Sequence, residues 1–262
     1  MVLQQAMYMT YGKKSTPWID PNQDYDMVQT LTFENPSGTC KIRLCRDASI
    51  ISWTVYYRAG TSGDWTAKIV SGDSDTFPVT STTMQVAHDW NKDGNNYMTC
   101  SFYWQSTNLK EIDISLKAVL SGVVGGDFMY EYAYGCSSLT SLSVPDTSGL
   151  TSVGRFFMGY YARGCFSLTS LSVPDTSGLT SVGDYFMGYY AYNCSSLTSL
   201  ILPKAWHFKT NNVSWSVPSS RRWVLKGKVI DPADLTDRKG LTTSGKTLHT
   251  NYIQDPNNVE LL

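Results

Sequence analysis

Acidic and amide side chains that suit a hard cation occur together in one segment, DWNKDGNN, which begins at Asp89. Asp89, Asn91 and Asp93 have the alternate spacing of the first ligands in an EF-hand calcium loop, and Gly94 follows where that loop turns. The twelfth position of such a loop is a bidentate acid, and here it is Cys100. Asx and Gly residues between strand-like runs also form ordinary hairpin loops. We therefore favour a hairpin and keep calcium binding by the three residues as the alternative.

No arrangement typical of an enzyme stands out elsewhere. Asp-Thr-Ser-Gly begins at Asp146 and again at Asp175, but an aspartic-protease loop needs glycine as its third residue, and two copies in successive units of a repeat do not form a carboxylate dyad. The histidines, His88, His207 and His249, have no cysteine or carboxylate at ligand spacing and no Ser-His-Asp order. We predict no catalytic residue, no resident metal, no cofactor and a protein that is not an enzyme.

Composition and charge indicate where such a protein works. Only 16% of the 262 residues are charged, while 17 are Tyr and 8 are Trp, which is typical of a β-rich extracellular or virion protein. The net charge of −1 gives no electrostatic attraction for nucleic acid. The start, MVLQQAMYMTYGKK, lacks the pattern of a signal peptide, and no run approaches the ~18 apolar residues of a membrane span. We expect an extracellular, cell-surface or virion protein with no signal peptide in this chain, no membrane insertion and no nucleic-acid partner.

Self-similarity at a fixed period is the strongest signal in the chain. The segment SLTSLSVPDTSGLTSVG, residues 138–154, recurs unchanged at residues 167–183. Further positions keep the same period: Phe128, Phe157 and Phe186; Met129, Met158 and Met187; Ala133, Ala162 and Ala191; Cys136, Cys165 and Cys194; Leu139, Leu168 and Leu197; Leu142, Leu171 and Leu200; Pro145, Pro174 and Pro203. A repeat of this length predicts units that stack and bury a shared core.

Within a unit, the pattern LxxLxV predicts a short strand. Leu142 and Val144 fall on one face of that strand, and Ser141 and Ser143 fall on the other. Pro145 then ends ladder pairing, and Asp-Thr-Ser-Gly forms a turn.

The stretch that follows, VGRFFMGYYARGC, predicts a helix of about two turns. Its apolar residues recur at i, i+1, i+4, i+5 and i+8, which is one helix face: Phe157, Met158, Tyr161, Ala162 and Cys165. We therefore expect 29-residue strand–turn–helix units with a continuous core. The periodic cysteines are expected to be buried free thiols that act as small apolar side chains, rather than a disulfide framework.

The pattern FMxxYAxxCxSLTSLxVP resembles the bacterial surface-antigen type of leucine-rich repeat, the BspA-like family, over about residues 109–218. Upstream, LKEIDIS (109–115) imitates LTSLSVP with an offset of 30 and predicts a degenerate first strand; downstream, NVSWSVP (212–218) looks like a last strand. Repeats of that family are commonly shorter than the unit found here, so the DTSGLTSVG connection is a departure. The resemblance implies a surface adhesion or recognition protein, and related modules also occur in phage proteins.

The chain divides into four parts by pattern. Residues 1–25 have no clear period and are expected to form an arm or tail, and residues 26–107 predict a small β-sandwich from strand-like runs between Gly, Asn and Asp turns. Residues 108–218 are expected to form a short leucine-rich-repeat solenoid, and residues 219–262 a C-terminal cap or assembly segment. The expected fold class is α+β, mostly β.

The candidate partner-binding site is the face of the predicted helices that lies opposite the core. It carries aromatic residues and an arginine: Tyr134, Phe156, Tyr160, Arg163, Tyr185, Tyr189 and Tyr192. The exposed strand face carries serine instead, at Ser141, Ser143, Ser170, Ser172 and Ser199. Tyr and Arg are enriched at the energetic centres of interfaces and Ser is under-represented there. The alternative is that the aromatic residues only seal the stack or pack on a neighbouring domain.

We expect a non-enzymatic recognition or adhesion protein that binds a protein or glycan on a cell surface. The alternative is a structural subunit of a phage virion appendage or extracellular filament, in which copies of the chain assemble as a homo-oligomer. The family resemblance favours the first function, whereas the few charges and the rigid repeats favour the second.

Overall fold

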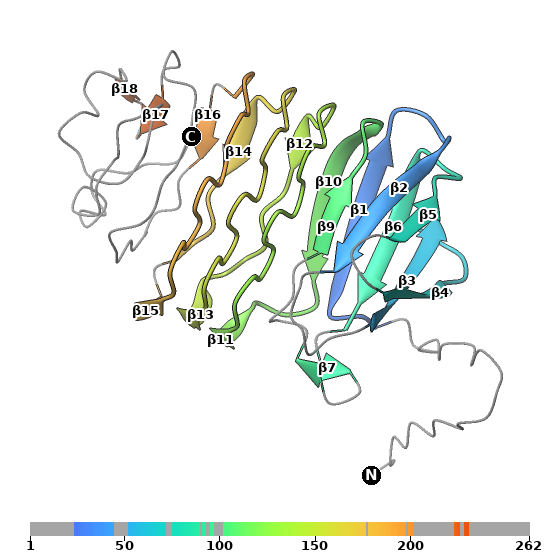
Figure 1. Ribbon diagram of the computed structural model, residues 1–262, viewed down its shortest axis with the longest axis horizontal. Helices are drawn as coiled ribbons and strands as arrows, with labels where there is room; N and C mark the ends of the chain where they lie inside the picture. The colour runs from blue at the N-terminus through green and yellow to red at the C-terminus, as the bar shows by residue number, and fades with distance from the viewer. Residues whose placement is uncertain are drawn as a thin grey trace, which may run out of the picture.

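The computed structural model describes residues 24–44, 52–71, 75–89, 91–92, 95–96, 102–176, 178–197, 199–201, 223–225 and 228–230. Every regular element in this part of the chain is a β-strand (Figure 1). The strands are β1 (Met27–Phe33), β2 (Thr39–Leu44), β3 (Ser52–Ala59), β4 (Thr66–Ser71), β5 (Asp75–Pro78), β6 (Thr83–His88), β7 (Asn91–Lys92), β8 (Asn95–Asn96), β9 (Phe102–Gln105), β10 (Leu109–Leu116), β11 (Ser121–Val124), β12 (Ser141–Leu142), β13 (Gly149–Val153), β14 (Ser170–Ser172), β15 (Ser181–Val182), β16 (Ser199–Ile201), β17 (Trp223–Leu225) and β18 (Lys228–Ile230).

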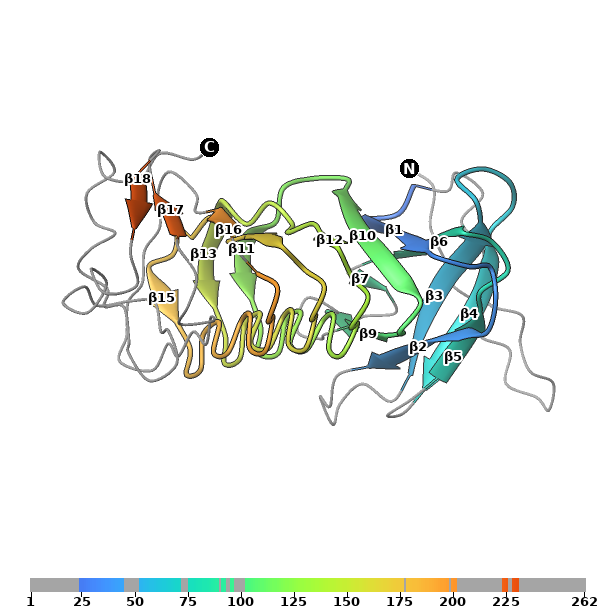
Figure 2. The ribbon, with the colours of Figure 1, turned by 90° about the horizontal axis from the view of Figure 1, so that it is seen from above.

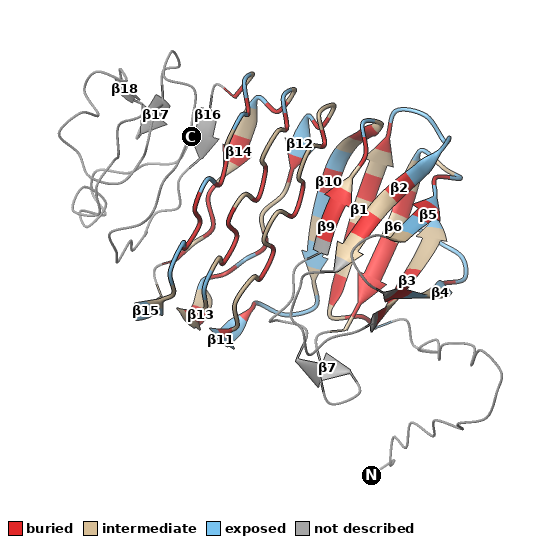
Figure 3. Cartoon of the chain, in the orientation of Figure 1, coloured by how far each residue is buried: buried red, intermediate tan, exposed pale blue. Residues whose placement is uncertain are grey.

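Two sheets form the N-terminal part. One has the strand order β12-β10-β1-β6-β3-β4, and the other has the order β5-β2-β9. Burial alternates along β1, as expected for a strand with one face on a core (Figure 3). Side chains of the two sheets meet between them: the Trp104 indole N–H donates to Gln29 Oε1 at 2.8 Å, and the Phe77 ring lies 5.9 Å from the Tyr57 ring.

The repeat units lie side by side and pair in parallel (Figures 1 and 2). β13 pairs with β11 and β15, and β14 pairs with β16. The register repeats the sequence period, since Ser152 lies opposite Ser181 and Leu171 lies opposite Leu200. Between these strands, each unit contains a segment of consecutive turns, at the lower edge of the repeat part in Figure 2.

The predicted helices are not present in the described residues, so the expected α+β leucine-rich-repeat solenoid of strand–turn–helix units is wrong. Backbone N–H groups of the turn segments bond either to the neighbouring unit or to the third residue before them, as Gly159 N–H does to Phe156 O at 2.8 Å, and not to the fourth residue before them. The N–H of Tyr160 donates to Gly188 O at 2.8 Å, and the N–H of Ala162 donates to Tyr190 O at 2.9 Å. The described part of the molecule consists of sheets and turns.

Left-handed backbone conformations are the local reason that a helix does not form. Four positions in each unit have positive φ, between 48° and 75°: Asp127, Met129, Glu131 and Gly135; Phe156, Met158, Tyr160 and Gly164; Tyr185, Met187, Tyr189 and Asn193. A right-handed helix needs negative φ at every residue. Glycine and asparagine adopt positive φ easily, whereas aromatic residues do so only where the surrounding structure holds them there.

Close approach between units also requires glycine. A Cβ atom on Gly154 would lie 2.4 Å from Gly126 N and 2.5 Å from Gly125 C. A Cβ atom on Gly183 would lie 2.4 Å from Arg155 N. Backbone therefore packs on backbone at these points, where a side chain would hold successive units apart.

The core residues predicted from the period are buried, although the backbone that carries them differs from the prediction. Leu139, Leu142, Phe157, Met158, Ala162, Cys165, Leu168 and Leu171 are all buried in one cluster, and Val144 is partly buried against it. Equivalent rings form columns: the Phe128, Phe157 and Phe186 rings stack at 5.7 and 5.6 Å, and the Tyr132, Tyr161 and Tyr190 rings stack at 5.2 Å each. The predicted free thiols at Cys136, Cys165 and Cys194 are confirmed.

The edge strand β10 links the N-terminal sheets to the first repeat unit. It pairs antiparallel with β1 and in parallel with β12. Glu111 lies opposite Ser141 and Ile112 opposite Leu142, so the predicted degenerate first strand and its offset of 30 are confirmed. The six-stranded sheet is therefore continuous across the boundary expected at residues 107 and 108.

Strand β9 makes the corresponding link on the turn side. The N–H of Trp104 donates to Tyr132 O at 2.8 Å, and the N–H of Ala133, one repeat period further along the chain, donates to Tyr161 O at 2.8 Å. Cys136 Sγ also donates to Trp104 O at 3.2 Å, as Cys165 Sγ does to Ala133 O. The N-terminal part thus continues the hydrogen-bond pattern of the repeat, through β10 beside the strands and through β9 beside the turn segments.

The expected arm at residues 1–25 lies almost wholly outside the described residues, as does the expected cap at residues 219–262, of which β17 and β18 form an antiparallel pair. Within the described residues, no helix has the length and apolar character needed to span a membrane.

Candidate recognition surface

In the turn segments, buried pairs of residues alternate with single outward side chains. In the second unit, Phe157 and Met158 are buried, Tyr160 is half-buried, and Tyr161 and Ala162 are buried again. The outward positions of the three units form three columns: Asp127, Phe156 and Tyr185; Glu131, Tyr160 and Tyr189; Tyr134, Arg163 and Tyr192. All seven candidate residues belong to these columns, and together we call Tyr134, Phe156, Tyr160, Arg163, Tyr185, Tyr189 and Tyr192 the aromatic stripe.

Rings of successive units stack along the aromatic stripe. The Phe156 and Tyr185 centroids are 5.0 Å apart with 19° between the ring planes. The Tyr160 and Tyr189 centroids are 4.9 Å apart with 13° between the planes. This near-parallel arrangement follows from the backbone register, because equivalent residues of adjacent units lie about one strand spacing apart. The structure therefore brings the candidate residues together on one surface.

Arg163 lies among three tyrosine rings of the stripe. Its guanidinium carbon is 4.9 Å from the Tyr134 centroid, 5.0 Å from the Tyr160 centroid and 5.5 Å from the Tyr192 centroid. These distances are within the range of cation–π attraction. Arg163 forms no ion pair with any residue that the structure describes, so its N–H donors remain available to an acidic or carbonyl group of a partner.

The surface extends beyond the residues that the sequence singled out. The Tyr130 ring lies 5.2 Å from that of Phe156, and the Arg155 guanidinium lies 4.4 Å from the same ring. At the N-terminal end, the Tyr103 ring of β9 lies 5.7 Å from that of Tyr134. Tyr130 occupies the position of a glycine in the later units, so it breaks the period that marks the other columns. Tyr103 is indicated even less by the sequence, because β9 pairs with the first unit as the units pair with one another but does not match the repeat in sequence.

Three tyrosines of this surface have a raised hydroxyl pKa: Tyr103, Tyr130 and Tyr160. Burial, followed by the nearby Glu131 carboxylate, raises the pKa of Tyr103 to about 12 and that of Tyr130 to about 12. Burial, followed by the neighbouring Tyr189, also raises the pKa of Tyr160.

Because stacking covers the ring faces, the stripe offers mainly ring edges and hydroxyl groups to a partner. The most exposed rings are Tyr185 and Tyr189, at 46% and 37%.

The serine face offers less to a partner. Ser141 is exposed, while Ser143 is half-buried and its Oγ accepts a hydrogen bond of 2.6 Å from the Ile114 N–H. Ser170 and Ser172 are also half-buried, and the Ser199 side chain lies outside the described residues. Part of this face is thus used to join strands.

The calcium alternative gains no support from the residues that can be placed. Asp89 Oδ1 accepts a hydrogen bond from the Asp26 N–H at 3.4 Å, so this carboxylate links the residue before β1 to the residue after β6. Asp93 and the side chain of Asn91 lie outside the described residues. Within the described part, no three His, Cys, Asp or Glu side chains are grouped so as to hold a metal ion.

Of the three histidines, only His88 falls in the described part of the chain. It is buried with its ring 4.8 Å from that of Trp53, and burial lowers its pKa well below the ordinary value. The Asp146 and Asp175 turns lie in successive units, and Thr147 Oγ1 of the first donates to Asp175 O of the second. These Asp-Thr-Ser-Gly segments therefore serve to join units.

No family model matches the chain, no curated protein matches it, and no solved structure matches it. The resemblance to BspA-like repeats consequently stays a prediction from the motif.

Proposed function

We propose that the protein is a non-enzymatic recognition protein that binds a protein or glycan on a cell surface through the aromatic stripe. The observation that supports this most is the ordered, partly exposed row of tyrosine rings and arginine across three successive units. Solvent-facing aromatic residues in contiguous rows are uncommon on monomeric proteins and are typical of interaction sites.

The energetics favour the turn side of the stack over the serine side. Burying apolar ring surface contributes ~25 cal/mol per Å². Rings that are already stacked lose little side-chain entropy when a partner docks. A serine that exchanges a water hydrogen bond for one to a partner contributes only ~1 kcal/mol. Binding energy is therefore expected to concentrate at the aromatic stripe.

Left-handed backbone at the stripe supports the same proposal. Phe156, Tyr160, Tyr185 and Tyr189 have φ between 54° and 61°, a conformation that costs a bulky residue ~1–3 kcal/mol. Strained positions of this kind are frequent at sites that clamp a ligand. The buried Met158 shares the conformation, so the repeat architecture sets the strain at these positions.

A binding assay on intact cells tests the proposal. Fluorescently labelled wild-type protein is titrated onto a panel of bacterial and eukaryotic cells, untreated, protease-treated or periodate-treated, and bound protein is measured by flow cytometry. The test variant is Tyr185→Ala with Tyr189→Ala, and the matched control is Ser141→Ala with Ser170→Ala. We expect the tyrosine variant to bind about tenfold or more weakly, which corresponds to ~1.4 kcal/mol, and the serine variant to bind like wild type.

Stability must be measured in parallel, because each stacked pair also contributes ~0.5–1.5 kcal/mol to folding. The tyrosine variant is therefore used only at temperatures well below its own thermal unfolding transition, followed by far-UV circular dichroism. Equal binding by the two variants would contradict the proposal, as would stronger loss in the serine variant.

The second candidate function is a structural subunit of a virion appendage or extracellular filament. The observation that favours it is the backbone hydrogen bonding that joins successive units, in the β11-β13-β15 sheet and between the turn segments. Sedimentation velocity distinguishes the two functions. A discrete assembly that dissociates in the Tyr185→Ala, Tyr189→Ala variant would make the stripe an interface between copies, whereas a monomer that binds cells supports recognition.

A further inference from the structure

A polar cleft of about 700 Å³ lies between the N-terminal sheets and the first repeat unit. Its walls come from the loop between β1 and β2, the loop between β9 and β10, and Gly135 of the first unit. This volume is within the range of small-molecule sites in proteins. The cleft involves none of the stripe residues, so an inference about it goes beyond the proposed function.

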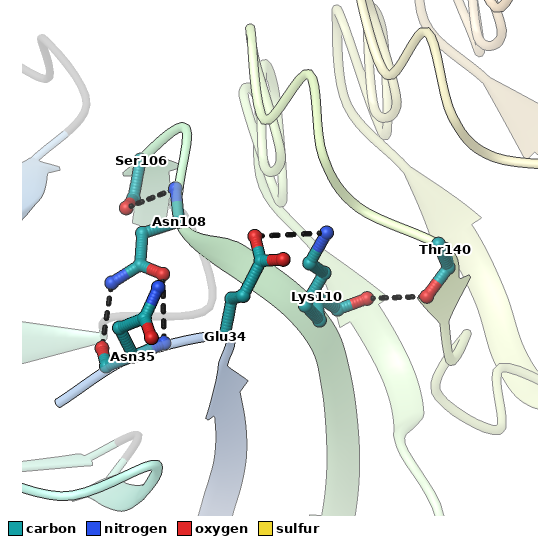
Figure 4. Close-up of polar contacts among 6 residues, drawn as sticks. All are labelled: Glu34, Asn35, Ser106, Asn108, Lys110 and Thr140. Carbon is teal, nitrogen blue, oxygen red and sulfur yellow. Dashed lines mark hydrogen bonds and ion pairs between the residues drawn. The ribbon is translucent and has the colours of Figure 1, made fainter.

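The two loops are held together before any ligand arrives (Figure 4). Asn108 Nδ2 donates to Asn35 O at 2.7 Å, and the Asn35 N–H donates to Asn108 Oδ1 at 3.0 Å. The Asn108 N–H also donates to Ser106 Oγ at 3.1 Å. Beside them, Lys110 Nζ lies 3.2 Å from a Glu34 carboxylate oxygen. A cleft with such fixed walls loses little entropy on binding a ligand.

A row of three polar side chains crosses the cleft. Lys41 on β2 lies opposite Thr76 on β5 and opposite Gln105 on β9, so the three residues share one face of the β5-β2-β9 sheet. Their neighbours Phe77 and Trp104 are buried, which places the row on the outer face.

The donors of this row are not used by the rest of the described chain. Tyr103 O–H donates to Gln105 Oε1 at 3.0 Å, which leaves the Gln105 amide N–H groups for another partner. Neither the Lys41 ammonium nor the Thr76 hydroxyl has a hydrogen bond or ion pair with any residue that the structure describes. The row therefore presents a positive charge flanked by an amide and a hydroxyl.

We infer that the cleft binds a carboxylate-bearing saccharide of the uronic-acid class. The Lys41 ammonium pairs with the sugar carboxylate, and Gln105 and Thr76 hydrogen-bond its hydroxyl groups. An apolar ligand would bury these donors without partners, a cost that disfavours it. Hydroxyl and amide side chains of the two loops and of the row both donate and accept, and so match sugar hydroxyl groups, whereas an acidic peptide side chain presents acceptors only.

Isothermal titration calorimetry with trigalacturonic acid tests this inference on the full chain. The other probes are neutral galactotriose and a tetraglutamate peptide. The test variant is Lys41→Gln, and the charge-matched control is Lys117→Gln, which removes an exposed lysine at the opposite end of β10. Lys41→Arg tests whether charge alone suffices.

We expect trigalacturonic acid to bind wild type and Lys117→Gln equally, and Lys41→Gln about tenfold or more weakly. Lys41→Arg should retain most of the binding, and galactotriose should bind more weakly than the acid. Absence of trigalacturonic acid binding, equal binding by Lys41→Gln, or tighter binding of tetraglutamate would each overturn the inference.

The Tyr185→Ala, Tyr189→Ala variant separates this inference from the proposed function. It leaves the cleft intact and should bind trigalacturonic acid like wild type. Conversely, a failed titration in wild type leaves the cell-binding comparison between the tyrosine and serine variants unchanged, so each proposal fails on its own measurement.

Discussion

The substitution Gly154→Ala distinguishes the stacked turns from the helix that the sequence suggested. In a helix, replacing glycine by alanine stabilises the protein by ~0.8–1 kcal/mol. In the structure, the added Cβ would lie 2.4 Å from Gly126 N and 2.5 Å from Gly125 C. The residues on either side hold this backbone in place, since the Gly154 N–H donates to Val124 O at 2.9 Å and the Asp127 N–H donates to Arg155 O at 2.7 Å. Because Gly154 does not have positive φ, the effect comes from the clash alone.

We expect Gly154→Ala to lower the free energy of unfolding by ~1–3 kcal/mol, the usual cost of overpacking. For a chain of 262 residues this corresponds to a fall in Tm of ~2–4 °C per kcal/mol. Urea denaturation followed by circular dichroism, with a thermal scan, measures both quantities.

Gly126→Ala is the matched control, because it changes a glycine on the backbone of the preceding unit that faces Gly154. Its Cβ would meet Arg155 O at 3.4 Å and Arg155 N at 3.8 Å, which is ordinary contact. We expect a change within ~0.5 kcal/mol for this variant. A Gly154→Ala protein as stable as wild type, or more stable, would refute the close approach of the units.

Two further predictions follow from buried titratable groups. Burial raises the pKa of Cys136 to about 12 and that of Cys194 to about 12. These two thiols and the buried Cys165 thiol should therefore resist a maleimide reagent in the native protein and react fully in denaturant without reductant. Rapid labelling of the native protein would contradict this. Burial lowers the pKa of His88, so the unfolded chain binds an extra proton below the ordinary histidine pKa of about 6.5, and stability should fall with falling pH by up to ~1.4 kcal/mol per pH unit. A His88→Gln variant should show a flatter dependence between pH 7 and pH 5.5, as measured by urea denaturation, and an unchanged slope would count against the buried neutral imidazole.

The repeat period predicted which side chains are buried but not the backbone that buries them. Phe157, Met158, Tyr161 and Ala162 have spacings that suit a helix face, and consecutive turns place the same residues inward. A helix and consecutive turns differ here in a hydrogen bond between units: the Tyr160 N–H bonds to a carbonyl of the next unit. A pattern within one segment carries no information about such a bond.

The same distinction applies at the ends of the candidate surface. The outward columns were predictable because residue identity recurs at a fixed period, and the stripe was found on that basis. Tyr130 and Tyr103 were missed. Tyr130 occupies a glycine position, and Tyr103 lies on β9, which is linked to the repeat through hydrogen bonds of Trp104 with Tyr132 and Cys136 that the sequence does not reveal. The cleft beside Lys41 was also missed, because it is assembled from loops distant in sequence.

The most direct test of this account is a measurement of the hydrogen bond made by the Tyr160 amide. Scalar coupling across hydrogen bonds, recorded by NMR on deuterated protein, identifies the carbonyl that accepts each N–H. The structure predicts coupling between Tyr160 N and the Gly188 carbonyl carbon, since Tyr160 N and Gly188 O are 2.8 Å apart. Coupling of Tyr160 N to the carbonyl of Phe156, four residues earlier, would show a helix and contradict the stacked turns that form the aromatic stripe.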